Sequence, residues 1–196
     1  MKYVFVDMDG TIAEWGYPDG RIGGEYRFGD YIGKQPINDV IAEIYNLFSN
    51  TEEYIVFVVS AVPNSKAIIE KNAWLNNFFV VPYENRIFIL NGENKVEIIN
   101  FYLRNVLGVE PQENAILIDD RRDWLMDAER NGYQVYHPTK LIGMFQNRMA
   151  EMQKQKTENN QDEEKENVES PEENVVEPTQ DINPMVEESS EAQGEV

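Results

Sequence analysis

The feature that most constrains the fold is an alternation of short apolar segments with amphipathic segments over the first 140 residues. The apolar runs are too short for helices and match strands buried on both faces of a sheet. They lie at residues 3–6, 54–59, 86–90, 115–118 and 133–136. Strands that alternate with helices are typical of βαβ units, so the pattern predicts an α/β fold with a mainly parallel sheet.

Helix ends are marked by residues that favour them. Pro36 is expected to open the first helix, because proline is favoured at the first helical position. Asn64 or Ser65 can cap the second helix, and Asn94 can cap the third. Gly108 is expected to end that third helix. These signals place helices between the predicted strands.

The last quarter of the chain differs from the rest in composition. Apolar residues at helical spacing between 141 and 152 predict a final helix that frays near Lys156. Residues 151–196 carry 3 basic and 15 acidic residues, a net charge of −12, and no aromatic residue. Such a segment cannot bury enough apolar surface to offset its ordering entropy. We therefore predict a folded domain over residues 1–154 and an acidic disordered tail over 155–196, solvated or docked on a basic protein partner.

Composition also excludes several classes of protein. The chain has no cysteine, which rules out a disulfide framework and a thiolate metal site. The N-terminal apolar run is about four residues long, shorter than a signal peptide or a membrane span requires. These features predict a soluble cytoplasmic protein without a membrane partner.

The strongest chemical signal is the sequence Asp7-Met8-Asp9-Gly10-Thr11 directly after the first strand. In an open α/β sheet, ligands bind beyond the carboxyl ends of the strands. Two carboxylates this close repel each other, and a divalent cation relieves the repulsion. Hard oxygen ligands suit Mg²⁺.

Three further motifs follow at the ends of later elements. Asp119 and Asp120 end the fourth predicted strand, and Ser60 ends the second. Lys95 lies in the first turn of its helix, where a cation opposes the helix dipole. A surface lysine is favoured elsewhere, which points to a function for Lys95. Each residue also has an ordinary explanation: the aspartates and Ser60 can cap a helix or turn the chain, and Lys95 can be solvated.

The ordered set resembles the haloacid dehalogenase superfamily of phosphohydrolases. Its four motifs appear here in order, over residues 3–120, as Asp7, Asp9 and Thr11, then Ser60, then Lys95, then Asp119 and Asp120. The resemblance implies a three-layer α/β/α Rossmann-like fold and a Mg²⁺-dependent phosphatase. The presence of Asp9 favours phosphatase over dehalogenase chemistry.

The resemblance also implies a role for each residue. Asp7 would be the nucleophile and a metal ligand, forming an aspartyl-phosphate intermediate. Asp9 would be the general acid and then the base, and its backbone carbonyl would bind Mg²⁺. Asp119 and Asp120 would complete the metal site, and which one touches the metal directly is left open. The phosphate-binding residues would be Gly10, Thr11, Ser60, Ala61 and Lys95.

The substrate is predicted from what surrounds the motifs. Residues 12–35 form a small flap, expected to be a loop or β-hairpin, instead of a full cap. The flap carries Trp15, Tyr17, Tyr26, Phe28 and Tyr31, which suit either stacking on a base or packing on the body. The chain resembles 5′(3′)-deoxyribonucleotidases and the phosphatase domain of polynucleotide kinases.

We therefore expect a nucleotide or a similar small phosphate ester as substrate. Residues 1–150 carry a net charge of −7, which weighs against a polynucleotide 3′-end as substrate. A non-catalytic binding or regulatory module with an acidic tail is the third alternative, and the presence of Asp9 argues against it.

Overall fold

The computed structural model describes residues 1–22, 24–90, 92–111 and 114–168, with residues 158–168 described by their backbone alone. The chain divides into two units, Met1–Lys154 and Gln155–Val196. The motifs predicted from the sequence all lie in the first unit.

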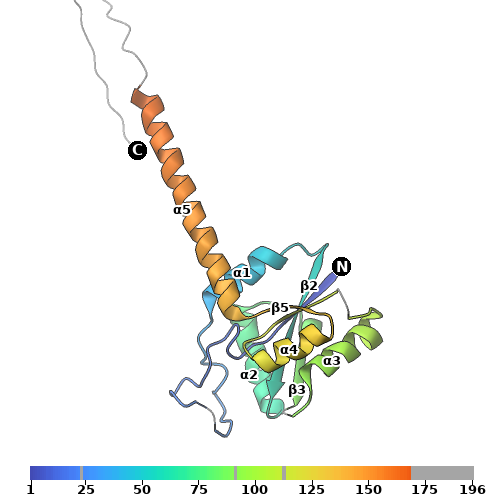
Figure 1. Cartoon of the computed structure of the whole chain (residues 1–196). Coiled ribbons are helices and arrows are strands. Elements are labelled where there is room, and N and C mark those ends of the chain that lie inside the picture. The colour runs from blue at the N-terminus through green and yellow to red at the C-terminus, as the bar shows by residue number, and fades with distance from the viewer. Residues whose placement is uncertain (23, 91, 112–113, 169–196) are drawn as a thin grey trace, which may run out of the picture. The chain divides into compact units, whose positions relative to one another are not determined.

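Five strands form one sheet in the first unit (Figure 1). They are β1 (Lys2–Val6), β2 (Tyr54–Val62), β3 (Arg86–Leu90), β4 (Ala115–Ile118) and β5 (Gln134–Tyr136). Their order is β3-β2-β1-β4-β5, and each pairing is parallel. The predicted α/β fold with a mainly parallel sheet is confirmed.

The helices follow the strands as the alternation predicted. They are α1 (Asn38–Phe48), α2 (Ser65–Phe78), α3 (Lys95–Tyr102), α4 (Arg122–Arg130) and α5 (Pro138–Val168), with short turns η1 (Tyr83–Asn85) and η2 (Leu103–Leu107). The prediction that Pro36 opens α1 is wrong, because the helix begins two residues later, after Ile37. Asn64 and Asn94 cap α2 and α3 with their side chains, as predicted. Gly108 adopts a left-handed conformation, with φ of 69°, and ends η2.

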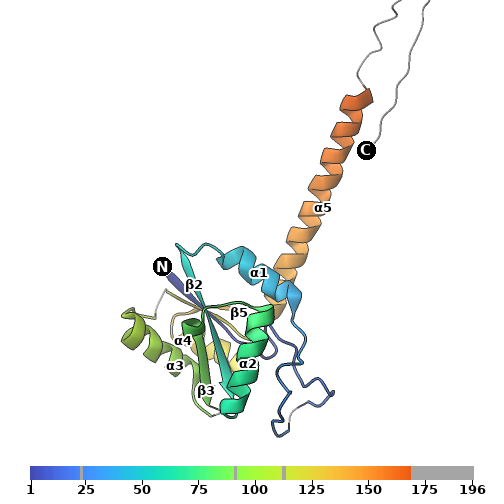
Figure 2. The ribbon, with the colours of Figure 1, turned by 180° about the vertical axis from the view of Figure 1, so that it is seen from behind.

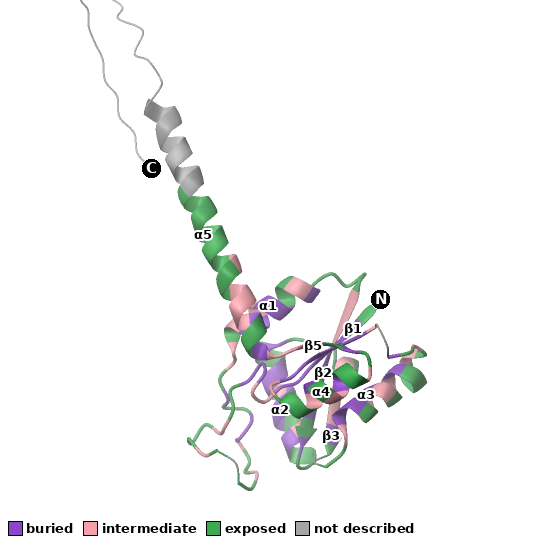
Figure 3. Ribbon diagram, viewed as in Figure 1, coloured by how far each residue is buried: buried purple, intermediate pink, exposed green. Residues whose placement is uncertain are grey.

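Helices cover both faces of the sheet (Figures 1 and 2). Alternate residues of β1 point to opposite faces: Val4 and Val6 pack with α1, α2 and Leu141 of α5. Tyr3 and Phe5 pack with α3 and α4. Figure 3 shows buried residues concentrated where the strands and helices meet. The three-layer α/β/α arrangement is therefore built from strands that are apolar on both faces.

The strand order places the motifs at one edge of the sheet. The chain passes from β1 to β2 on one side and later returns to β4 on the other side of β1. Such a switch point leaves a crevice beyond the carboxyl ends of the two central strands. Asp7 follows β1 there, and Asp119 follows β4.

The flap is a loop in the residues that the structure describes. Residues 12–22 and 24–35 contain turns and isolated bridges but no strand, so of the two predicted forms the loop is present. A bridge from Asp9 to Ala13 and another from Ala13 to Pro36 close its base.

The final helix is longer than predicted. It was expected to fray near Lys156, and α5 continues to Val168. Residues 155–168, predicted as part of the disordered tail, lie in α5, whereas residues 169–196 lie outside the described residues, so disorder there stays a prediction. Among the helices of the described ranges, none combines the length and the apolar character needed to cross a membrane.

Candidate active site

A buried ion-pair cluster joins the first, third and fourth motifs. Lys95 Nζ lies 2.6 Å from Asp7 Oδ1 and 2.5 Å from Asp119 Oδ2. All three residues are buried, and Lys95 is only 3% exposed. The Asn94 cap begins α3 at Lys95, and α3 packs its Val96 and Ile99 against the sheet. The position of α3 therefore places the Lys95 ammonium group between the carboxylates of Asp7 and Asp119.

Burial dominates the pKa values of the two carboxylates in this cluster. It raises the pKa of Asp7 to about 6, helped by the charges of Asp119 and Asp9, although Lys95 acts in the opposite direction. Burial also raises the pKa of Asp119 against the same lysine. The pKa of Lys95 is lowered by burial but raised more strongly by its two carboxylate partners, so it stays charged. One cation therefore balances two carboxylates only in part.

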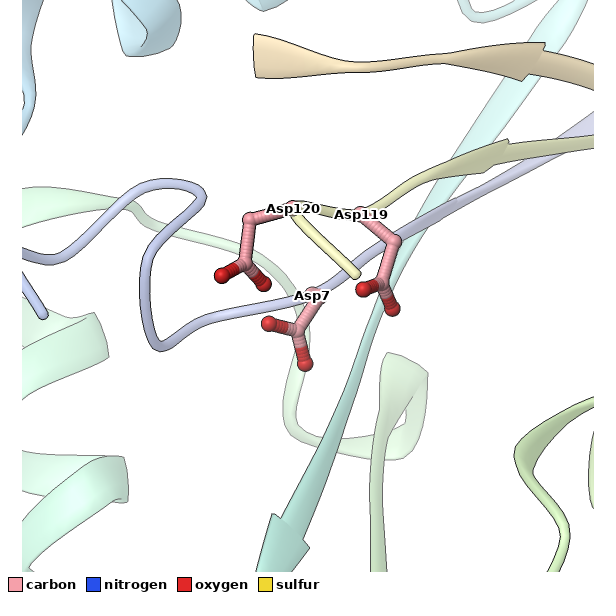
Figure 4. Close-up of side chains that lie close together, drawn as sticks. All are labelled: Asp7, Asp119 and Asp120. Carbon is pink, nitrogen blue, oxygen red and sulfur yellow. The ribbon is translucent and has the colours of Figure 1, made fainter. Parts of the chain in front are cut away.

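A third carboxylate completes a group that could hold a metal ion. Asp7, Asp119 and Asp120 each offer an oxygen, and these oxygens lie within 4.8 Å of one another. Figure 4 shows the three carboxyl groups facing a common space. The Asp120 carboxylate packs directly against the backbone of Gly10. This packing requires glycine, because an added Cβ would collide with that carboxylate and the φ of Gly10 is 83°.

The hydrogen bonds of the two adjacent aspartates differ. Asp119 accepts from Lys95 with one oxygen and from the Arg121 backbone N–H, at 2.8 Å, with the other. Asp120 Oδ1 is buried and has no hydrogen-bond partner among the described residues. Burial and the charge of Asp7 raise the pKa of Asp120. Asp120 is thus the adjacent carboxylate with an oxygen still available to a cation.

Asp9 is held apart from this group by two other lysines. Lys71 Nζ donates to Asp9 Oδ2 at 2.5 Å. Lys34 Nζ lies 2.9 Å from Asp9 Oδ1, which is an ion-pair distance, but the angle is not that of a hydrogen bond. Burial alone would raise the pKa of Asp9, but the two ammonium groups outweigh it and lower that pKa. Asp9 is therefore ionised, and its carboxylate lies outside the candidate metal group.

Two of the predicted phosphate-binding residues, Ser60 and Ala61, contact Lys71, which also binds Asp9. Ser60 is buried, and its Oγ accepts a hydrogen bond from Lys71 Nζ at 2.7 Å. The carbonyl of Ala61 accepts from the same ammonium group at 2.8 Å. The buried Oγ1 of Thr11, also predicted to bind phosphate, has no hydrogen-bond partner within the described part of the chain.

A cavity of about 390 Å³ opens onto the cluster. Asp7, Asp9, Lys95 and Asp120 line it, together with Ala61. Aromatic residues form part of its wall, namely Trp15, Tyr31 and Trp124. The Arg121 guanidinium, which also lines the cavity, lies 4.8 Å from the centroid of the Trp124 ring. The arrangement suits a ligand with an anionic end and a flat apolar part.

Two functional candidates were missed in the sequence. Lys71 lies on the buried face of α2, where Ala67, Trp74 and Leu75 are also buried, so a charged residue at a core position was a usable signal. Lys34 lies in the irregular flap, where no periodicity predicts burial. Its contact with Asp9 depends on the path of the loop.

Comparisons with known proteins show likeness at the level of the fold. No family model matches the chain, and no curated protein matches it. Among solved structures, the N-terminal part of a Bacteroides fragilis protein containing a phosphatase domain, complexed with Mg, is 19% identical with a TM-score of 0.43. The match covers 69% of this chain and 35% of the Bacteroides fragilis chain. The present chain therefore spans about a third of the length of that protein.

A second solved structure is D,D-heptose 1,7-bisphosphate phosphatase from Burkholderia thailandensis. It is 11% identical with a TM-score of 0.46, and the match covers 76% of this chain and 99% of that one. The family resemblance rests on the chain's own residues: Asp7, Lys95 and Asp119, of the first, third and fourth motifs, meet beyond the carboxyl ends of β1 and β4. Ser60, of the second motif, is joined to Asp9 through Lys71. In its parallel α/β fold and in the order of its motifs, the chain resembles the haloacid dehalogenase superfamily of phosphohydrolases.

Proposed function

We propose that the protein is a Mg²⁺-dependent phosphatase that hydrolyses a phosphate monoester through an aspartyl-phosphate on Asp7. One observation carries the proposal: Asp7 and Asp9 line the same cavity but lie in different environments. Asp7 belongs to the candidate metal group, whereas Asp9 is paired with Lys34 and Lys71. Two carboxylates in such different environments suit two different roles in one reaction.

The carboxylate group fits a divalent cation. Asp120 Oδ1 is a buried acceptor that lacks a partner in the described ranges, and Asp120 offers one carboxylate oxygen to the group that it forms with Asp7 and Asp119. A hard cation such as Mg²⁺ prefers oxygen ligands of this kind. When bound, it would neutralise the carboxylates and the oxygens of a phosphoryl group.

In the first step, a carboxylate oxygen of Asp7 attacks phosphorus. The bond from phosphorus to the ester oxygen breaks as the new bond forms, and the leaving oxygen takes a proton from Asp9. Lys95 stays charged and supports the negative charge that collects around Asp7. The negative charge of a phosphoryl group in the cavity that Asp9 lines would raise the pKa of that acid, so that it can hold the proton it gives up.

In the second step, a water molecule attacks the phosphorus of the aspartyl-phosphate. Asp9, now ionised, accepts the proton from that water, and the bond from phosphorus to Asp7 breaks. Inorganic phosphate leaves and Asp7 is restored. The pairing of Asp9 with Lys71 and Lys34 lowers its pKa, so the carboxylate is ionised and able to accept that proton, although the lowered pKa makes it a weaker base.

A nucleotide is the proposed substrate because of the aromatic wall beside Asp9. A second hollow, of about 190 Å³, is lined by Asp9, Trp15, Tyr17, Tyr31 and Lys34. The leaving group of the ester must lie near Asp9, its proposed general acid. It would therefore contact the aromatic residues that line this hollow. Aromatic faces stack on bases of any sequence. The net charge of −7 over residues 1–150 disfavours a polynucleotide.

The test is phosphate release from nucleoside 5′- and 3′-monophosphates, sugar phosphates and a 3′-phosphorylated oligonucleotide, each with Mg²⁺ or with EDTA. We expect Mg²⁺-dependent release, fastest from a nucleoside monophosphate. Asp7→Asn should abolish it, because an amide cannot act as the nucleophile. Asp39→Asn, in the first turn of α1, is the matched control and should keep the activity.

The outcomes separate the alternatives. Fastest release from the oligonucleotide would replace the nucleotidase reading with a polynucleotide 3′-end phosphatase. Activity that survives Asp7→Asn would rule out the aspartyl-phosphate. No release from any ester would favour a non-catalytic binding module.

A further inference from the structure

Glu70 is a buried carboxylate that the proposed reaction does not use. It lies on α2 and is 2% exposed. Its partners all come from the flap: it accepts from the Tyr26 hydroxyl at 2.6 Å and from the backbone N–H groups of Gly29 and Tyr31 at 2.7 and 2.9 Å. A carboxylate that satisfies several donors of one loop fixes the path of that loop.

A second contact from α2 holds the end of the flap. Trp74 lies one turn after Glu70, on the same face of α2. Its indole Nε1–H donates to the Lys34 carbonyl at 2.8 Å, and both residues are buried. The helix face that touches the flap is therefore polar at Glu70 and at the indole nitrogen.

The flap segment held in this way delivers Lys34 to Asp9. Lys34 is 6% exposed, and its Nζ lies 2.9 Å from Asp9 Oδ1. The same Nζ donates to the Glu14 carbonyl at 3.2 Å, which joins the two ends of the flap. The rings of Tyr17 and Tyr31 surround it, with centroids 5.4 and 5.5 Å away. A buried ammonium ion with these partners depends on the loop for its position.

We propose that Glu70 is a positioning residue for the reaction, acting through the flap and Lys34. By accepting three hydrogen bonds from residues 26–31, it holds Lys34 against Asp9, while Lys71, its neighbour on α2, binds Asp9 from the other side. The flap is thus a fixed part of the site that orients the acid–base carboxylate. The kinetic consequence rests on the proposed phosphatase function; the contact itself does not.

A role in folding alone would make different predictions. If Glu70 only stabilised the fold, its replacement and that of Lys34 would affect the turnover number independently. If it acts through Lys34, the two effects overlap, because residues that act as a unit are not additive. A double-mutant cycle separates the two cases.

The kinetic arm compares Glu70→Gln, Lys34→Met and the double variant in the full chain. We expect each single change to lower kcat about tenfold or more, in keeping with the loss of hydrogen bonds to a charged group. The double variant should lose no more than the larger single loss, with KM changing less than kcat. Lys34→Arg keeps the charge and should recover most of the kcat that Lys34→Met loses. Lys66→Met and Glu97→Gln, at exposed helix positions, are the matched controls.

The second arm needs no substrate. Amide hydrogen exchange in Glu70→Gln should be at least tenfold faster at Gly29 or at Tyr31, because these N–H groups bond to different oxygens of Glu70 and Gln replaces one of the two oxygens with an NH2 group. Strands β1 and β2 should keep their wild-type protection. Lys34→Met should leave the exchange at Gly29 and Tyr31 unchanged, since Glu70 holds the flap independently of Lys34.

The results decide the proposal in either case. Additive losses of kcat, or unchanged exchange in Glu70→Gln, would overturn it. A wild-type protein that hydrolyses no phosphate ester would overturn the proposed function, and the exchange arm would still decide whether Glu70 holds the flap.

Discussion

Three buried lysines form ion pairs with different carboxylates of the candidate site. Lys95 balances Asp7 and Asp119, whereas Lys71 and Lys34 both serve Asp9. Asp9 is thus kept ionised by lysines other than the one that binds the candidate metal group. Each carboxylate should therefore respond differently to replacement.

The two adjacent aspartates offer the sharpest comparison. Asp120→Asn removes the acceptor that lacks a partner within the described residues, so we expect the Mg²⁺ affinity to fall about 10- to 100-fold. Asp119→Asn should weaken Mg²⁺ binding less and should instead loosen Lys95, because both Asp119 oxygens are already hydrogen-bonded. Titration calorimetry with Mg²⁺ measures both. A larger loss in Asp119→Asn would reverse the assignment.

The stability that Glu70 contributes should depend on pH. Burial by itself raises the pKa of Glu70, but the hydrogen bonds from Tyr26, Gly29 and Tyr31 act against it, and the pKa lies below the ordinary 4.5. A carboxylate with a lowered folded-state pKa stabilises the fold above its unfolded pKa, and this contribution disappears as the pH falls through the folded value. The difference in unfolding free energy between wild type and Glu70→Gln should thus be full at pH 6 and shrink below pH 4.5. Urea unfolding at several pH values measures it, and a difference that grew on acidification would contradict the assignment.

At the scale of elements, two of the site lysines, Lys71 and Lys95, lie on helices whose first turns are capped by asparagine. Asn94 caps α3 immediately before Lys95, and Asn64 caps α2 well before Lys71. An N-cap fixes the first turn most strongly, because it satisfies the N–H groups of that turn. The two caps should therefore matter equally for stability but unequally for the site.

Asn94→Ala and Asn64→Ala form a matched pair. Each should lower the free energy of unfolding by about 1 kcal/mol. Only Asn94→Ala should also lower phosphate release, since Lys95 is the first residue after that cap. Chemical denaturation and the phosphate assay measure the two effects. Equal loss of activity in both variants would show that the cap of α3 has no special link to Lys95.

At the scale of the whole molecule, the chemistry belongs to the first unit. Met1–Lys154 contains the sheet, the flap and every candidate site residue, while the second unit begins at Gln155. The acidic charge is concentrated in residues 151–196. The predicted tail is therefore expected to be separable from catalysis.

Truncation after Lys154 tests this separation. We expect the shortened chain to keep the kcat and KM of the full chain, and its thermal midpoint to shift by no more than a few degrees. The phosphate assay and a melting curve measure these values. Loss of activity would instead assign a catalytic or structural role to residues 155–196.

The sequence by itself determined the order of the fold and half of the site. Apolar runs between amphipathic segments specify a parallel α/β sheet because strands covered on both faces must be apolar on both faces. Asp7, Asp9, Lys95, Asp119 and Asp120 were predictable because they follow strands or open a helix, and parallel strands bring their carboxyl ends to one edge.

Only the tertiary structure decided which charges meet. Lys71 and Lys34 reach Asp9 from a helix face and from a loop, across 62 and 25 positions of sequence, and no local pattern encodes those contacts. The same is true of Glu70, whose partners lie on the flap. Local pattern specifies where a chain turns and which face is apolar; long-range packing selects the partner of each buried charge, because a buried charge is tolerated only where its partner is already placed.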